Sequence, residues 1–193
     1  MRVDVLTGKA LDDALDDVAR LRIEVFRDFP YLYDGDLAYE RRYLDIYRSS
    51  AQAVLVGAFD GAQLVGAATG TPLADHAEDF AAAFAGSGIE METVFYCAES
   101  VLLPAWRGRG IGHRFFDLRE EHARRNGFTR VAFCSVVRPV DHPLRPVDHA
   151  PLDPFWRKRG YRPVPGVIAH FRWKDIDRET DTAKPLQFWM REL

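Results

Sequence analysis

A glycine-rich turn carries the clearest chemical signal in this chain of 193 residues. An apolar run stops at Pro104, and three glycines and two arginines follow within residues 107–112, directly before an amphipathic segment. This pattern predicts a strand, a tight turn and the start of a helix. Glycines let the main chain approach a ligand closely, and the unpaired N–H groups at a helix start favour negative charge. The turn therefore predicts a diphosphate site.

The spacing of the glycines indicates which diphosphate. Glycines at 108, 110 and 112 do not fit the dinucleotide pattern G-x-G-x-x-G, and no lysine lies between Lys9 and Lys158 to complete a mononucleotide P-loop. The segment Arg107-x-x-Gly110-x-Gly112 instead resembles the acetyl-CoA signature, Arg/Gln-x-x-Gly-x-Gly/Ala, of the GNAT superfamily of N-acyltransferases. The segment Phe155-Trp-Arg-Lys-Arg-Gly-Tyr161 is similar to the short C-terminal helix of that superfamily.

The order of predicted elements extends the resemblance over nearly the whole chain. Apolar runs and alternation predict strands at 2–6, 53–59, 63–71, 95–103, 130–137, 161–164, 168–173 and 186–192. Helical spacing predicts helices at 11–26, 37–47, 74–84, 110–126 and 153–159. The resemblance implies an α/β (α+β) GNAT fold, with a mostly antiparallel mixed sheet of six or seven strands, splayed in the middle and flanked by helices. We expect a single domain over residues 1–193.

Composition narrows the class of protein. The chain is 47% hydrophobic and 28% charged with a formal net charge of −3, which is typical of a globular protein and gives no reason to expect a nucleic-acid partner. It lacks an apolar run of about 18 residues and a signal-peptide pattern, so we expect no membrane association and a cytoplasmic location. Cys97 and Cys134 lie in apolar runs, which favours free buried thiols over a disulfide.

The resemblance assigns cofactor contacts to two segments. The main chain of Arg107, Gly108, Arg109, Gly110, Ile111 and Gly112 would hold the pyrophosphate of acetyl-CoA, the expected cosubstrate, with added charge from the arginines. Pantetheine would pair with the strand edge at Ser100, Val101 and Leu102, where an N–H of Ser100 or Leu102 would bind the acetyl carbonyl. The alternative is that the glycines only permit a tight strand-to-helix turn.

The catalytic groups are harder to assign. Glu99 is the candidate base, acting directly or through water, although a rim or ion-pair role is the alternative. Several superfamily members carry a glutamate four residues before Ser100, where this chain has Tyr96. Many carry a tyrosine where this chain has Trp156, so Tyr161 or Tyr96 becomes the candidate acid for the leaving thiolate. Core packing is the alternative role for Tyr161.

Two loops are candidates for binding the amine acceptor. Tyr31, Tyr33 and Asp34 lie between the first two predicted helices, and aromatic faces and carboxylates suit a cation. A solvated turn is the alternative. His142 lies in the proline-rich segment 138–154 as a candidate proton shuttle. The Asp-His pairs of that segment lack metal-binding spacing, so no metal is expected.

These observations predict an acetyl-CoA-dependent N-acetyltransferase acting on a primary amine of a small molecule or peptide. A homodimer is a further expectation, because members of the superfamily are often dimers. Tyr96 and Trp156 at the two expected catalytic positions leave a second interpretation open, namely an acyl-CoA-binding regulatory module with little or no catalysis. A third, a pure interaction domain, would have no use for the glycine turn.

Overall fold

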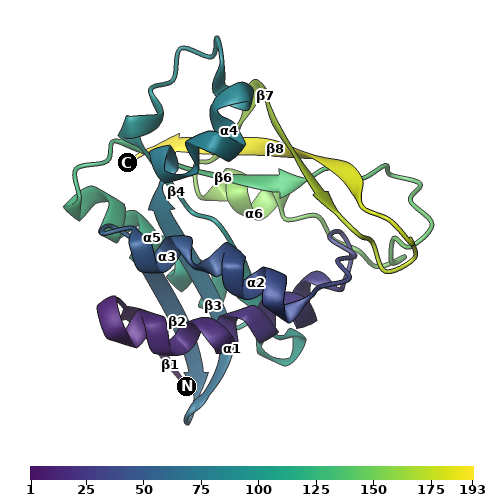
Figure 1. Ribbon diagram of the computed structural model, residues 1–193, viewed down its shortest axis with the longest axis horizontal. Coiled ribbons are helices and arrows are strands. Elements are labelled where there is room, and N and C mark those ends of the chain that lie inside the picture. Colours follow the sequence, from purple (N-terminus) through teal and green to yellow (C-terminus); the bar gives the residue numbers. More distant parts are fainter.

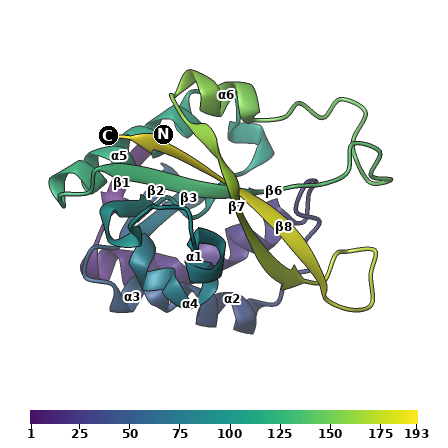
Figure 2. The ribbon, with the colours of Figure 1, turned by 90° about the horizontal axis from the view of Figure 1, so that it is seen from above.

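The computed structural model describes residues 1–193 as one eight-stranded sheet with helices on both faces (Figures 1 and 2). The strands run in the order β1-β2-β3-β4-β6-β8-β7, and β5 pairs with β3 alone. The strands are β1 Arg2–Leu6, β2 Val54–Asp60, β3 Gln63–Pro72, β4 Val94–Tyr96, β5 Ser100–Leu102, β6 Arg130–Val136, β7 Arg162–Trp173 and β8 Thr182–Glu192. The helices are α1 Gly8–Phe26, α2 Leu37–Leu44, α3 Ile46–Ser49, α4 Ala77–Phe84, α5 Ile111–Arg125 and α6 Asp153–Lys158. Short 3₁₀ turns are η1 Leu73–His76, η2 Met91–Thr93 and η3 Pro104–Trp106.

The predicted fold class is confirmed. All strand pairs are antiparallel except β4 with β6, and helices flank the sheet. The sheet has eight strands rather than six or seven. This equals the number of predicted strand segments, because 95–103 divides into β4 and β5 while 161–164 and 168–173 join as β7. None of the helices combines the length and apolar character that crossing a bilayer requires.

Alternating side chains of β2 build the core on both faces of the sheet. Leu55 packs among residues of α1, α2 and α3, including Leu15, whereas Val56 packs against Ile111 and Phe115 of α5. This is the period-two alternation of a strand with both faces covered. Helix α4 covers the C-terminal half of the sheet on the first face, and α6 covers it on the second (Figure 2). The helical spacing in the sequence thus identified the inward faces of α1 and α5.

The middle of the sheet opens at a break that the sequence did not reveal. The predicted strand 95–103 is two strands, because residues 97–99 leave the ladder. Strand β4 runs parallel to β6, and the N–H of Cys97 makes the last link, 2.7 Å from the carbonyl oxygen of Ala132. Strand β5 then pairs only with β3, opposite residues 66–68. One edge of β5 is therefore free, and the sheet splays there.

Three other boundaries differ from the prediction. Strand β7 is continuous, with a pairing irregularity between Pro163 and Ile168, so the two expected strands are one. Strand β8 begins at Thr182 rather than Leu186, since its polar start still pairs with the end of β7. The expected helix 37–47 divides at Asp45 into α2 and α3.

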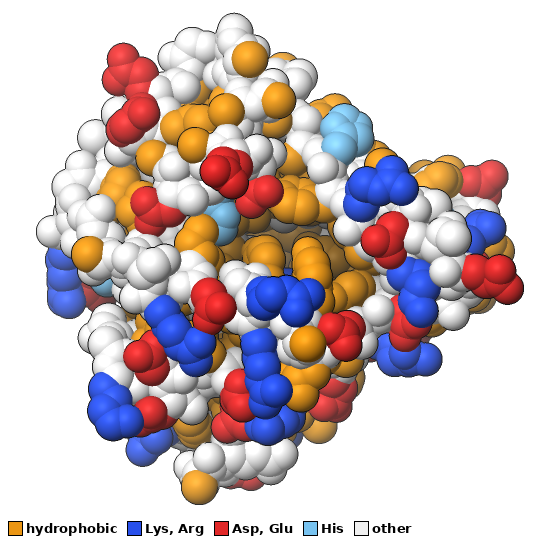
Figure 3. All heavy atoms as spheres, viewed as in Figure 1, with side chains coloured by type: hydrophobic (Ala, Val, Ile, Leu, Met, Phe, Trp, Pro, Cys, Tyr) orange, Lys and Arg blue, Asp and Glu red, His pale blue; other side chains and the backbone are white.

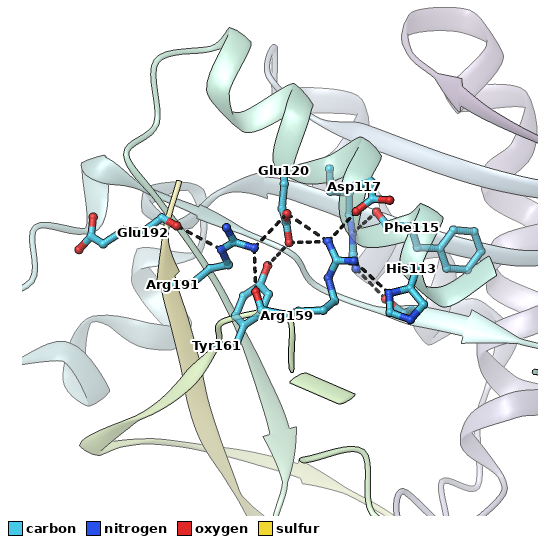
Figure 4. Close-up of polar contacts among 10 residues, drawn as sticks. His113, Phe115, Asp117, Glu120, Arg159, Tyr161, Arg191 and Glu192 are labelled. Carbon is cyan, nitrogen blue, oxygen red and sulfur yellow. Dashed lines mark hydrogen bonds and ion pairs between the residues drawn. The ribbon is translucent and has the colours of Figure 1, made fainter. Parts of the chain in front are cut away.

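A buried polar cluster ties the C-terminal strands to α5 (Figure 4). Glu120 of α5 accepts hydrogen bonds from the Tyr161 hydroxyl at 3.0 Å, from Arg159 at 3.1 Å and from Arg191 at 3.4 Å. Arg159 also donates to Asp117 at 2.7 Å. Since buried carboxylates are tolerated only when paired, this cluster fixes α5 against β7 and β8.

Replacement of Glu120 by alanine tests this cluster. Breaking a buried ion pair from one side costs about 3–5 kcal/mol, and here Arg159 and Arg191 would lose their buried carboxylate, leaving Arg159 with only the exposed Asp117. We expect a loss of about that size in the free energy of unfolding measured in urea. The matched control is Glu121→Ala, since Glu121 is exposed and pairs only with exposed Arg125. Its loss should stay below about 1 kcal/mol. Equal losses for the two variants would contradict the structure.

Candidate functional site

The glycine turn is open above its main chain. Strand β5 leads through η3 to Gly108 and Gly110, which have φ of +74° and +79°, and α5 begins directly afterwards. Side chains rarely adopt such φ values, so both positions favour glycine. A Cβ placed on either glycine would have no neighbour within 4 Å. The main chain is therefore open to a ligand at these two positions.

The turn presents an unbroken row of free donors. None of the main-chain N–H groups from Gly108 to His113 donates a hydrogen bond within the chain. They lie at the N-terminus of α5, where the helix dipole adds positive potential. Arg107 and Arg109 lie beside them and donate to the carbonyl oxygens of Leu102 and Ala105, each at 3.1 Å. Such an array fits a diphosphate, and the residues present therefore suit the pyrophosphate of coenzyme A.

The free edge of β5 leads from this turn toward the sheet opening. The Thr69 N–H donates to the Glu99 carbonyl and the Leu103 N–H to the Val65 carbonyl, at 3.1 and 3.0 Å. Because antiparallel pairs alternate, the N–H groups of Ser100 and Leu102 point away from β3 toward the opening. The side chain of Val101 is buried in the core. This edge can pair with an extended chain of amides.

Arg119 of α5 fixes the break between β4 and β5. Its side chain is fully buried and donates to the carbonyl oxygens of Thr69 and Glu99, both at 3.0 Å. It also donates to the Ser100 hydroxyl at 2.8 Å. The Thr69 carbonyl also accepts from the Ala98 N–H and the Glu99 carbonyl from the Thr69 N–H, each at 3.1 Å. Arg119 therefore adds a second donor to each carbonyl and fixes the chain where the ladder to β6 has ended.

A cavity of about 110 Å³ lies on the α1–α4 face beside this break. Figure 3 shows it as the hollow with apolar walls near the centre of the view. Aromatic side chains make up much of its wall, including Phe26, Tyr31, Tyr33, Tyr43, Phe171 and Trp173. Glu99 lines the cavity as well. The next residue, Ser100, begins the free strand edge, so the cavity and this edge are joined by two consecutive residues.

Glu99 belongs to a buried chain of charges in this cavity. Arg22 of α1 approaches Glu99 Oε2 at 2.7 Å and also donates to Oε2 of Glu40 on α2. The hydroxyl of Tyr47 lies 3.4 Å from Glu99 Oε2. The second oxygen of each carboxylate, Oε1 of Glu40 and Oε1 of Glu99, is buried without a hydrogen-bond partner. Arg22 is thus a component of the site.

Tyr96 also lines the cavity, and its hydroxyl contacts the sulfur of Cys134 at 3.2 Å. Burial raises the pKa of Tyr96 well above its usual value and raises the pKa of the Cys134 thiol to about 12. Both groups therefore stay protonated at neutral pH. Trp156, by contrast, packs among aromatic rings of β6 and β8, with its ring centroid 4.9 Å from that of Phe133.

Three predicted site residues do not line the cavity. The hydroxyl of Tyr161 faces Glu120 within the core. Asp34 forms an ion pair with Lys174 at 2.6 Å. His142 accepts a hydrogen bond from the Leu144 N–H at 3.2 Å, within the loop after β6. No three side chains of histidine, cysteine, aspartate or glutamate converge to hold a metal ion.

Sequence reasoning missed several residues of the site, among them Arg22, Glu40 and Arg119. The sequence contained a signal for Arg22 and for Arg119. Arg22 lies four residues after inward-facing Val18, and Arg119 lies four residues after inward-facing Phe115. A charged residue on the apolar face of a predicted helix indicates a buried partner.

Residues 17–147 match the sequence profile of the Acetyltransferase (GNAT) family. The chain belongs to this family. Its fold is similar to that of a ribosomal-protein-alanine N-acetyltransferase from Brucella melitensis, with 14% identity over 100% of both chains and a TM-score of 0.62. A GCN5-related N-acetyltransferase from Kribbella flavida is 17% identical over 99% of this chain and 98% of that one, with a TM-score of 0.58. A Salmonella typhimurium protein solved with its cofactor acetyl-CoA is 10% identical over 100% and 95%, with a TM-score of 0.57. Comparison with curated protein sequences gave no match.

As a GNAT acetyltransferase, the protein should lose coenzyme A affinity on Gly110→Asp. A carboxylate there would face the pyrophosphate, and losing two charged hydrogen bonds or more corresponds to at least about a 100-fold weaker Kd. Calorimetry with coenzyme A measures the effect. The matched control is Gly61→Asp, which also replaces a glycine of positive φ with open space around it, in the β2–β3 hairpin. Near-normal affinity of the Gly110 variant would refute the diphosphate site.

Proposed function

We propose that the protein is an acetyl-CoA-dependent N-acetyltransferase whose acceptor is a primary amine of a small molecule or peptide. The observation that carries the proposal is that Ser100 and Glu99 are adjacent. Ser100 lies on the strand edge that leads from the diphosphate turn, and Glu99 lines the aromatic cavity. A cofactor extended along that edge and an amine in the cavity would meet at the break between β4 and β5.

The main chain supplies the binding and polarising groups. The N–H row of residues 108–113 would hold the pyrophosphate, and the free N–H groups of Ser100 and Leu102 are donors for pantetheine and for the acetyl carbonyl oxygen. Bound acetyl-CoA supplies a thioester: the amine nitrogen forms the C–N bond, the C–S bond breaks and the thiolate leaves. Because Arg119 holds the main chain of Glu99 and the side chain of Ser100, these donors are preorganised.

Glu99 is the base in this proposal. Its free Oε1 takes one proton from the ammonium form of the acceptor, directly or through one water. The nitrogen loses its second proton to the departing sulfur, so the products are an amide and a thiol, and Glu99 releases its proton to solvent. Tyr96 is a poor acid for the thiolate, because burial raises the pKa of its phenol far above that of a thiol. Tyr161 has no part in the transfer, since its hydroxyl is held by Glu120.

Thiol release distinguishes the enzyme from a regulatory module. We expect free coenzyme A thiol to accumulate when the protein is given acetyl-CoA and a panel of amines, and no accumulation above background without an amine. Tight coenzyme A binding without turnover across the panel would favour the acyl-CoA-binding module. Absence of coenzyme A binding would exclude both interpretations.

Glu99→Gln tests the role of the carboxylate. General base catalysis contributes about 10²- to 10⁴-fold, so kcat should fall by a factor in that range, while the Kd for acetyl-CoA changes less than about threefold. The amide keeps the shape of the side chain beside Arg22. Glu92→Gln, an exposed glutamate of η2, is the control and should leave kcat unchanged. An unaltered kcat for Glu99→Gln at every pH would remove Glu99 from the mechanism.

A further inference from the structure

The cavity beside Glu99 has an uncompensated negative charge. Its buried charged groups are one guanidinium, Arg22, and two carboxylates, Glu40 and Glu99. The other cation of the wall, Arg172, is exposed and donates to the main-chain oxygen of Asp181. The buried group of three therefore carries a net charge of −1. Buried charge is expensive unless it is paired, so a single positive charge is the missing partner.

The free oxygens identify where that positive charge belongs. Arg22 contacts one oxygen of each carboxylate, and Oε1 of both Glu40 and Glu99 is buried without a hydrogen-bond partner. An ammonium has three N–H donors and no acceptor, which suits two unpartnered carboxylate oxygens. Tyr33 remains a neutral phenol, because burial, the charge of Glu40 and a hydrogen bond to Glu40 raise its pKa, so it adds no positive charge to the group. Arg22 compensates one of the two negative charges, and the cavity wall supplies no second buried cation.

The size and the aromatic walls of the cavity limit the non-ammonium part of the acceptor. Its volume of about 110 Å³ is small beside the roughly 300–1,000 Å³ of sites for drug-sized ligands. Rings of Phe26, Tyr31, Tyr43 and Trp173 line it, and Arg22 already lies over the Tyr43 ring at 4.3 Å. Aromatic walls favour a flat apolar group and add cation–π attraction for an ammonium.

We propose that the acceptor is a compact primary amine with one positive charge and an apolar body, and that Glu40 selects for its charge. This rests on the proposed N-acetyltransferase function and narrows its acceptor class. Binding of the ammonium brings the buried group to neutrality. Transfer of its proton to Glu99 leaves that neutrality unchanged, because the amine and Glu99 then become neutral together while Arg22 and Glu40 remain paired. Polycations and acids would instead leave the site charged.

Calorimetry with coenzyme A present tests the charge requirement without turnover. The probes are 2-phenylethylamine and 2-phenylethanol, which share a body and differ in charge. We expect the wild-type protein to bind the amine about 10- to 100-fold more tightly, the range given by hydrogen bonds to charged groups. Equal affinities would overturn the proposal. This comparison needs no variant, so it stands even if substitutions of Glu40 prevent folding.

Glu40→Gln tests the selecting residue. The amine should lose at least about tenfold in affinity and its KM should rise by a similar factor, while the Kd for coenzyme A stays within about threefold. Glu24→Gln, an exposed glutamate of α1, is the matched control and should behave as wild type. An unchanged preference for the amine in Glu40→Gln would refute the role of Glu40.

A panel of acceptors separates this inference from the proposed function. With 2-phenylethylamine, spermidine, glutamate and an alanyl peptide, we expect kcat/KM to be at least about tenfold higher for 2-phenylethylamine than for the others. Turnover that favours spermidine, glutamate or the peptide would refute the compact monocation and leave the acetyltransferase intact. Absence of thiol release with every amine would refute the proposed function itself.

Discussion

The site depends on the hydrogen bonds that Arg119 donates at the break between β4 and β5. Where β5 parts from β6, the carbonyls of Thr69 and Glu99 and the hydroxyl of Ser100 receive hydrogen bonds from this one buried guanidinium. Each of these carbonyls also accepts one main-chain hydrogen bond, so Arg119 adds a charged second donor and links α5 to both β3 and the break. Arg119 belongs to α5, the helix that begins at the glycine turn. The same helix therefore fixes the main chain of Glu99, the proposed base. The two halves of the site are therefore parts of one rigid unit.

The two faces of the sheet carry sites of opposite electrostatic character. On the α5 face, main-chain N–H groups at residues 108–113 make an electropositive site from backbone alone, with arginines only beside it. On the other face, side chains of α1, α2 and the break make an electronegative site with aromatic walls. The free edge of β5 lies between them. The site that favours anions and the cavity that favours cations are therefore separated by the sheet, and Ser100 and Glu99 are the adjacent residues that connect them.

Local chemistry explains which parts could be predicted from the sequence. The glycine turn and α5 depend on residues close together in the chain, and the structure contains both. The break after Tyr96 was missed, because the run 95–103 is apolar except for Glu99 and Ser100 and its interruption depends on Arg119 and on pairing with β6. The Arg22–Glu40–Glu99 group was missed for a similar reason: its members come from three elements, and no spacing links them. Glu99 and Tyr31 were predicted from residue types that suit the chemistry, and both line the cavity.

The contact between Tyr96 and Cys134 bears on the fidelity of acyl transfer. A cysteine in the wall of an acyltransferase cavity is a competing nucleophile, and attack by its thiolate would place the acetyl group on the protein itself. With burial raising the pKa of Cys134 to about 12, only about one molecule in 10⁵ carries that thiolate at pH 7. A sulfur beside the tyrosine hydroxyl therefore fills space and remains inert toward thioesters. Burial of Cys134 in the cavity wall therefore disfavours transfer of the acetyl group to this sulfur.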